Sequence, residues 1–164
     1  MRKLYFCLVL NLLWPSLGFA QEVQTAFDTL NRCLLGAQSS TCRTLVTQDS
    51  QALYDRVSGY DVMECLPKET RYVSQHRSGQ HQIVRASTKL GETVRFLRLA
   101  FKKEQGAWKL DVPFSLQSAL GKNWQKQVQM TEQLYLFMRG QIKGKLNCEA
   151  VHALAAGPRK SPAS

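Results

Sequence analysis

Two stretches of alternating apolar and polar residues, joined by a short turn, constrain the fold of this chain most strongly. They run from Thr93 to Lys102 and from Ala107 to Val112. Their alternating apolar residues are Leu97, Leu99, Phe101, Trp108, Leu110 and Val112. A period of two predicts strands. A hairpin closed on Lys103 and Gly106 would pair Phe101 with Trp108 and gather all six side chains on one face. A slip of one residue would divide them between two faces, so we expect this register.

Two further strands precede this hairpin. Arg71 to His76 and Gln82 to Leu90 are rich in β-branched and aromatic residues. Ser78-Gly79 lies between them, and we expect it to form a two-residue turn. This pairing would place His76 opposite His81 and Tyr72 opposite Arg85.

Helical patterns lie on both sides of these strands. Residues 22–35 carry an apolar stripe at helical spacing, and a short helix through residues 42–46 and a third ending at Ser58 should follow. After Pro113, we expect a short helical segment to Leu120 and a longer helix over residues 122–139. The predicted fold class is α+β, with N-terminal helices packed on a curved antiparallel sheet and a C-terminal helix.

The first twenty residues have the pattern of a secretory signal peptide. Arg2 and Lys3 precede an apolar run of about ten residues, and Gly18 and Ala20 form a small-x-small site. We therefore expect cleavage after Ala20 and a periplasmic or secreted protein. The run is shorter than the roughly 20 apolar residues of a membrane-spanning helix, so no transmembrane anchor is expected. Residues 21–150 should form one domain, and 151–164 a flexible tail.

Four cysteines follow the predicted cleavage site, namely Cys33, Cys42, Cys65 and Cys148. An even number in an exported chain indicates disulfides. Three pairings are possible. We favour Cys33–Cys42, because these residues are close in sequence and flank a turn, which leaves Cys65 for Cys148. The spacing does not match a zinc site, and we expect neither a metal nor a cofactor.

The chain is basic, with a formal net charge of +10, and removal of Arg2 and Lys3 would leave +8. Such a charge favours anionic partners, and the alternative is that it serves solubility alone, because the basic residues are spread along the chain. No basic run is long enough for a nucleic-acid arm, and export also argues against nucleic acid. We therefore expect an acidic protein or another component of the cell envelope as the partner.

The order of the predicted elements resembles the nuclear transport factor 2-like (NTF2-like) superfamily. The segment Phe96-Leu-Arg-Leu-Ala-Phe-Lys-Lys-Glu-Gln-Gly-Ala-Trp-Lys-Leu-Asp-Val112 looks like the last two strands of that fold. The resemblance covers residues 22–112 and leaves residues 113–150 unexplained. It implies a cone-shaped cavity beneath a curved sheet, but it does not imply a reaction. Sheet-to-sheet dimers are common in that superfamily, so a dimer is possible.

Catalytic members of that superfamily carry polar side chains inside the cone. The corresponding candidate pocket residues here are Tyr72, His76, His81, Arg85 and Arg95. Tyr72 and Arg85 would hold an anion, and a histidine would move a proton. The opposite face carries Val73, Val84 and Ala86, which form the better core. We therefore favour no catalytic residue and no metal at His76 and His81.

A last candidate is the helix of residues 122–139, whose apolar stripe contains Trp124 and Val128. Lys122, Lys126 and Arg139 would flank it as a partner surface. Our first hypothesis is a non-enzymatic binding module that engages an acidic partner through a basic surface. The alternatives are a carrier of a small ligand or lipid in the cone cavity and, third, an isomerase- or lyase-like enzyme.

Overall fold

The computed structural model describes residues 20–34, 42–58, 65, 69–90, 93–141, 144 and 147–149. The predicted signal peptide, apart from Ala20, and the predicted tail lie outside these residues. The described chain has an α+β fold, as predicted. Its sheet contains four antiparallel strands in the order β1-β2-β3-β4. The strands are β1 (Thr70–Ser78), β2 (His81–Leu90), β3 (Thr93–Glu104) and β4 (Ala107–Asp111).

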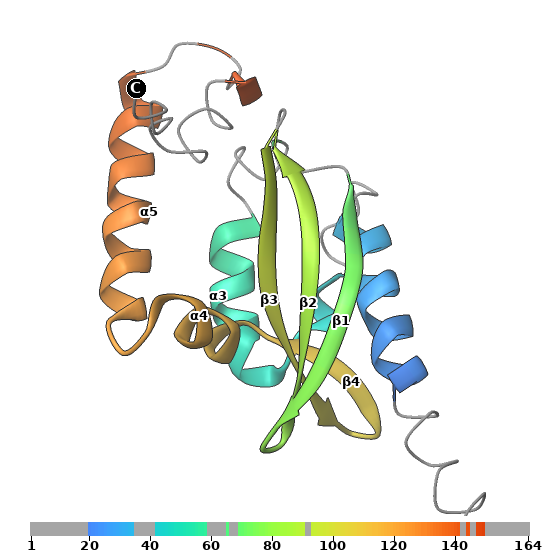
Figure 1. Cartoon of the computed structure of the whole chain (residues 1–164). Coiled ribbons are helices and arrows are strands. Elements are labelled where there is room, and N and C mark those ends of the chain that lie inside the picture. Colours follow the sequence, from blue (N-terminus) through green and yellow to red (C-terminus); the bar gives the residue numbers. More distant parts are fainter. Residues whose placement is uncertain are drawn as a thin grey trace, which may run out of the picture.

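Helices lie on both sides of this sheet. The first covers residues 20–34. A 3-10 turn, η1 (Arg43–Leu45), and the helix α3 (Gln48–Ser58) follow. After the sheet come α4 (Val112–Leu120) and α5 (Trp124–Gln141). In Figure 1, α5 and the helix of residues 20–34 lie at opposite sides of the molecule, with the sheet and α4 between them.

The main core lies between the helix of residues 20–34 and one face of the sheet. Val23, Phe27 and Leu30 pack against Val84 and Phe101, all of them buried. This core face is the one predicted for Val84 and Ala86. Val73 is 46% exposed instead, because a β-bulge between Tyr72 and Ser74 removes it from the regular pairing.

The hairpin of β3 and β4 has a different register from the predicted one. Phe101 pairs with Leu110 rather than Trp108, and Glu104 pairs with Ala107. The turn residues Gln105 and Gly106 both have positive φ, 53° and 81°. Such a pair suits the tight turn that matches the twist of a hairpin. The shift is two residues, so Leu97, Leu99, Phe101, Trp108 and Leu110 share one face as predicted. Val112 was expected at the end of this strand, but it is the first residue of α4.

The hairpin of β1 and β2 is shifted in the same way. Its turn is Gly79-Gln80, so Ser78 pairs with His81 and His76 with Ile83. Gly79 has φ +58°, which a glycine adopts without steric cost at the first position of such a turn. The predicted pair of His76 and His81 is therefore wrong.

Disulfides join Cys33 to Cys42 and Cys65 to Cys148, which is the favoured pairing. In the chain-entropy model, closing these loops contributes about 3 and about 4.5 kcal/mol. The second bond connects residues 83 positions apart. It therefore ties the segment after α5 back to the part of the chain that precedes the sheet.

Candidate functional site

The outer face of the sheet, opposite the core, divides into a covered and an open part. Towards the turn of β1 and β2, α4 lies over it, and Ile83 and Ala100 are buried there. Further along β2 and β3, the outward side chains are exposed except that of Ser87, which is half-buried. We call this open part the basic face. It consists of Arg71, Arg85, Lys89, Val94, Phe96 and Arg98.

Two arginines lie directly opposite each other at the centre of the basic face. Arg85 of β2 pairs with Arg98 of β3 in the sheet register. Like charges in this position repel and destabilise a sheet. The guanidinium of Arg85 lies 4.1 Å from the centre of the Phe96 ring, and this cation–π contact orients it. Phe96 is 56% exposed, and Arg85 and Arg98 are exposed as well, so the three residues belong to one accessible patch.

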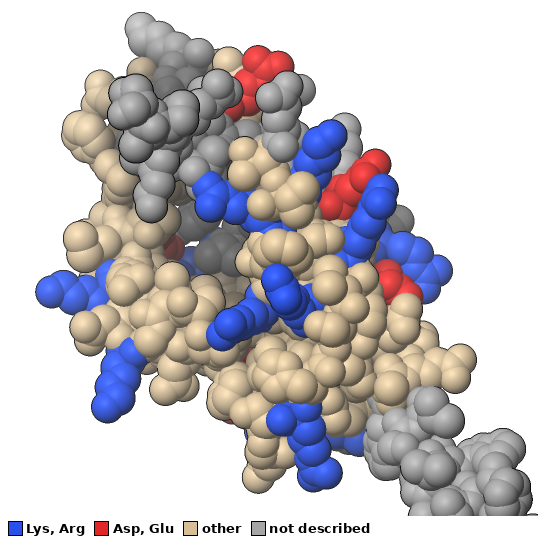
Figure 2. All heavy atoms as spheres, in the orientation of Figure 1, with Lys and Arg blue, Asp and Glu red and all other residues tan. Residues whose placement is uncertain are grey.

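Most carboxylates of the described residues are engaged away from the centre of this face. Glu22 binds Lys103 and Trp108, Asp55 binds Arg43, and Glu132 binds Arg56. Within the described residues, no carboxylate pairs with Arg85, Lys89 or Arg98. In Figure 2, Lys and Arg are prominent in the middle of the view, and most Asp and Glu lie toward its margin. The basic face is therefore a site with uncompensated positive charge.

The residues of the predicted pocket do not meet in one place. His76, His81 and Arg85 do point from one face of the sheet, the outer one. The bulge turns Tyr72 to the core face, where it pairs with Ala86 and its ring lies 6.1 Å from that of Phe27. Burial raises the pKa of the Tyr72 hydroxyl. The expectation that Tyr72 shares a face with the other three is wrong, because the extra residue of a bulge reverses side-chain alternation.

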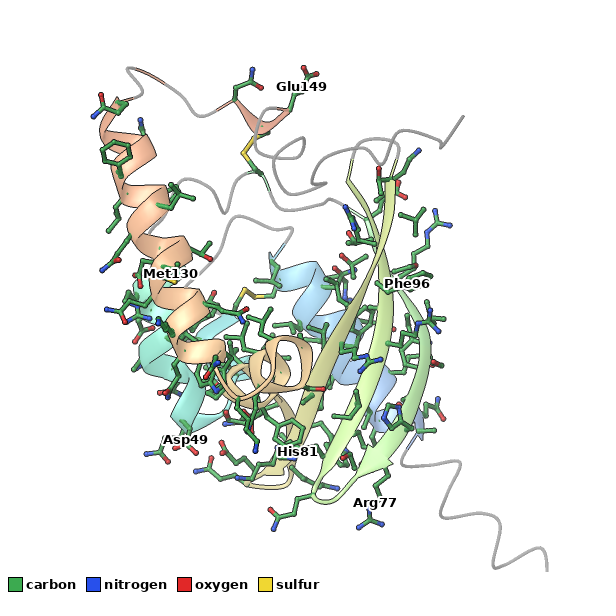
Figure 3. All side chains as sticks on the ribbon, turned by 60° about the vertical axis from the view of Figure 1, so that its left-hand side comes forward. Asp49, Arg77, His81, Phe96, Met130 and Glu149 are labelled. Atoms are coloured by element: carbon green, nitrogen blue, oxygen red, sulfur yellow. A yellow bond between two sulfur atoms is a disulfide. The ribbon has the colours of Figure 1, made fainter. Side chains whose placement is uncertain are left out.

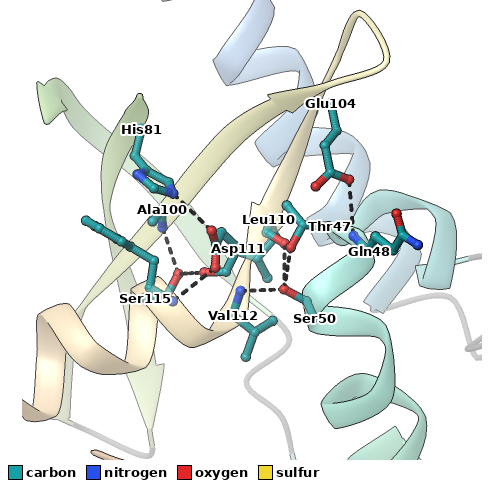
Figure 4. A network of polar contacts seen from close by, with 11 residues as sticks. Thr47, Gln48, Ser50, His81, Ala100, Glu104, Leu110, Asp111, Val112 and Ser115 are labelled. Atoms are coloured by element: carbon teal, nitrogen blue, oxygen red, sulfur yellow. Dashed lines mark hydrogen bonds and ion pairs between the residues drawn. The ribbon is translucent and has the colours of Figure 1, made fainter. Parts of the chain in front are cut away.

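His81 has a structural environment at the covered end of the sheet. Its Nε2 lies 2.9 Å from Oδ2 of Asp111, and its ring stacks on Phe114 at 3.9 Å between centroids. The other oxygen of Asp111 accepts a hydrogen bond from Phe114 N–H and caps α4. Figure 4 shows this network, and Figure 3 shows His81 and Phe96 at different levels of the sheet. His81 thus fixes α4 and lies apart from the basic face.

Arg95 occupies the opposite face from Arg85. It pairs with Thr88 in the register of β2 and β3, on the side of Leu97 and Leu99. Its side chain is exposed. Arg95 therefore lies at the margin of the core face and does not join the other candidate pocket residues.

The predicted partner surface on α5 is also divided. Lys122 and Lys126 are exposed near the start of this helix, whereas Arg139 is half-buried. Arg139 follows Glu132 by about two turns, and Glu132 pairs with Arg56 of α3 at 3.1 Å. Arg139 therefore shares the side of α5 that faces α3. An open groove of about 750 Å³ lies between these helices, lined by residues including Leu53, Trp124 and Val128.

A second groove runs along β3, beside the basic face. It has a volume of about 570 Å³ and lies between β3 and α4. Its walls include Phe96, Leu97, Arg98, Leu110 and Leu116. No sequence pattern pointed to this groove, because it depends on where α4 folds back after β4. The one sequence feature related to this groove is the alternation of Arg98 with apolar residues in β3.

Three or more His, Cys, Asp or Glu side chains that could hold a metal do not gather anywhere in the described part of the chain. Among the same residues, no helix is both long and apolar enough to cross a membrane. No family model matches the chain, and no curated protein or solved structure matches it either. The resemblance to the NTF2-like superfamily stays a prediction.

Proposed function

We propose that this protein is an exported, non-enzymatic binding module whose basic face engages an acidic protein partner in the cell envelope. The observation that carries the proposal is the pair Arg85 and Arg98. The two residues lie opposite each other in the register of β2 and β3, and no carboxylate of the described residues forms an ion pair with either.

The arrangement suits a protein carboxylate. Each guanidinium can donate two parallel hydrogen bonds to a carboxylate, and Arg is the residue that surfaces use for such bidentate contacts. An anion placed between Arg85 and Arg98 would also remove their mutual repulsion. Phe96 adds apolar area beside the charges, and the combination of Arg with aromatic residues is typical of protein-binding patches.

Export is the second part of the proposal. Two disulfides are compatible with an oxidising compartment, and the N-terminal segment has the pattern of a signal peptide. Mass spectrometry of the protein from its native cell should give a mature N-terminus at Gln21. An N-terminus at Met1 would contradict export by cleavage after Ala20.

The test of partner binding is crosslinking of the full chain in its native cells, followed by mass spectrometry. The double variant Arg85→Gln/Arg98→Gln should lose about tenfold or more of the captured acidic partner. An exposed charge pair contributes up to about 1 kcal/mol, and a desolvated pair in an interface contributes more. Lys122→Gln/Lys126→Gln removes the same charge from α5 and is the matched control. Loss of capture in the control alone would move the site to α5, and equal capture by both variants would overturn the proposal.

A further inference from the structure

β3 is paired along only part of its outer edge. It spans Thr93–Glu104, but β4 pairs only with its residues from Ala100 to Glu104. From Thr93 to Leu99, the edge that faces away from β2 has no strand beside it in the described structure. This free edge is about 23 Å long, at about 3.3 Å per residue.

The backbone groups that this edge presents follow from the hairpin. Glu104 and Ala107 close the turn of β3 and β4, so even-numbered residues of β3 direct their N–H and C=O groups towards the β4 side. Val94, Phe96 and Arg98 precede Ala100, which is the first residue of β3 that pairs with β4. Among the described residues, no backbone or side-chain partner for these groups is present.

A specific contact ends the pairing at Ala100. Ser115 Oγ accepts a hydrogen bond from Ala100 N–H at 2.8 Å and donates one to Asp111 C=O at 2.6 Å. The hydroxyl therefore stands between the two backbone groups that would form the next rung of the ladder (Figure 4). α4 leaves the sheet at this point, and the groove of about 570 Å³ opens between α4 and the free edge.

The free edge carries two charged residues, Arg95 and Arg98, but other common protections of an edge strand are missing. It has no proline, and Val94 and Phe96 are 57% and 56% exposed. Such an edge is a template for another extended chain. A helix beside it supplies a second wall with apolar positions such as Leu116. A peptide that adds to a strand edge uses its backbone for affinity and pockets for every second side chain for selectivity.

Charge indicates which chain would add here. The segment Thr93–Leu99 contains Arg95 and Arg98 and no acidic residue, and Arg85 lies beside Phe96. A second copy would bring two such edges together, with arginines and no carboxylate on either. An extended segment with Asp or Glu at alternate positions would instead place carboxylates against Arg85 and Arg98.

We propose that the free edge of β3, Thr93–Leu99, binds an extended acidic segment of the partner as an additional strand. This inference rests on the proposed function and specifies how the partner binds. In the added strand, every second side chain would point to the basic face, and these side chains should be Asp or Glu. The side chains on the other side would lie beside Leu97 and Leu99, which line the groove on the core face of the sheet, and should be apolar.

The test uses a soluble, labelled peptide library of about eight residues built from Val, Ile, Thr, Ser, Lys, Asp and Glu. Peptides selected on the full chain should alternate acidic and β-branched residues. Phe96→Pro removes the N–H group that points to the free edge but no bond to β2, and it should weaken binding about tenfold or more. Phe96→Val keeps that N–H and is the matched control, with a smaller loss. Thermal unfolding of each variant checks that it folds.

A second measurement does not alter the protein at all. Methylation of single backbone nitrogens in the selected peptide should abolish binding at every second position and leave it nearly unchanged between them. Equal effects at all positions, or full binding by Phe96→Pro, would overturn strand addition. If Arg85→Gln/Arg98→Gln still lost the peptides in that case, the basic face would remain the site.

Two other outcomes would also overturn the inference. Selection of no acidic peptide would show that the edge does not recognise such a segment. The crosslinking experiment would then test independently whether the basic face binds a partner. A dimer in analytical ultracentrifugation that Phe96→Pro dissociates would identify a second copy of this chain as the occupant.

Discussion

The two halves of β3, Thr93–Leu99 and Ala100–Glu104, both contain a phenylalanine, but the two rings have very different environments. Phe101 is 1% exposed, pairs with β2 and β4, and packs against the helix of residues 20–34. Phe96, only five positions earlier in the same strand, is 56% exposed and pairs only with β2. Apolar residues and strand propensity are present in both halves. The difference comes from the neighbours, since β4 stops at Asp111 and α4 turns away.

The comparison indicates that the covered half of β3 contributes mainly to folding stability and the open half mainly to partner binding. Burial against a helix and a second strand stabilises the covered half. The open half contributes less to the core and keeps backbone groups available, a feature of segments that bind other chains. Substitutions in the two halves should therefore have different consequences. Those in the covered half should lower stability, and those in the open half should weaken partner binding.

The largest expected difference is between two alanine substitutions of phenylalanine. Phe101→Ala should lower the free energy of unfolding by about 3–5 kcal/mol, because it leaves a cavity in the main core. Phe96→Ala should lower it by less than about 1 kcal/mol, because the ring is mostly in solvent. Urea unfolding followed by Trp fluorescence measures both. Similar losses for the two variants would mean that the two halves are equally buried in solution.

The next effect concerns the hydroxyl that ends the pairing of β3 with β4. Ser115→Ala should cost about 1–3 kcal/mol, because it leaves the buried N–H of Ala100 without its acceptor. Ser118→Ala changes an exposed serine of the same helix and is the control. Hydrogen exchange should show faster exchange at Ala100 in the first variant only. Unchanged exchange there would contradict the role of Ser115 in ending the ladder.

The smallest effect is a dependence on pH at the covered half. Glu22 accepts a hydrogen bond from Trp108 Nε1 at 3.2 Å and pairs with Lys103 at 3.3 Å. The Trp108 hydrogen bond first, and then Lys103, hold the pKa of this carboxyl below its ordinary value of 4.5. A lowered pKa gives stability that is present above pH 4.5 and is lost as pH falls towards the folded-state value.

Glu22→Gln removes this titration, so its stability should change less than that of the wild type between about pH 5 and pH 3. Thermal unfolding across that range measures the difference. The group is exposed, so we expect a small shift that salt weakens further. A pH profile that is identical in both proteins would show that Glu22 does not contribute.

Several features of the site were predictable from local patterns. The positions of β1 to β4 followed from β-branched content and a period of two, and the core face followed from Val84 and Ala86. The favoured disulfide pairs also matched. Each depends on spacing along the chain, which the sequence contains directly. The groups on the basic face were predicted in part, since Arg85 was a candidate but Arg98 and Phe96 were not.

The register of the hairpins was less predictable. Both turns lie one residue later than expected, because backbone conformation at Gln105, Gly106 and Gly79 decided where each turn begins. The bulge near Val73 had no signal in the pattern, and it moved Tyr72 to the core. An alternation with a period of two residues is unchanged by a shift of two residues. It therefore predicts which face each side chain of a strand occupies, but not the residue with which it pairs.

The sequence by itself thus determined the order of the elements, the two faces of each strand and the net positive charge. These properties follow from covalent order, side-chain alternation and ionisation. The tertiary structure decided that Arg85 lies opposite Arg98, that Asp111 is held by His81 and that half of β3 has a free edge. Each of these depends on contacts between residues distant in sequence, where small competing energies choose among several pairings that the same pattern allows.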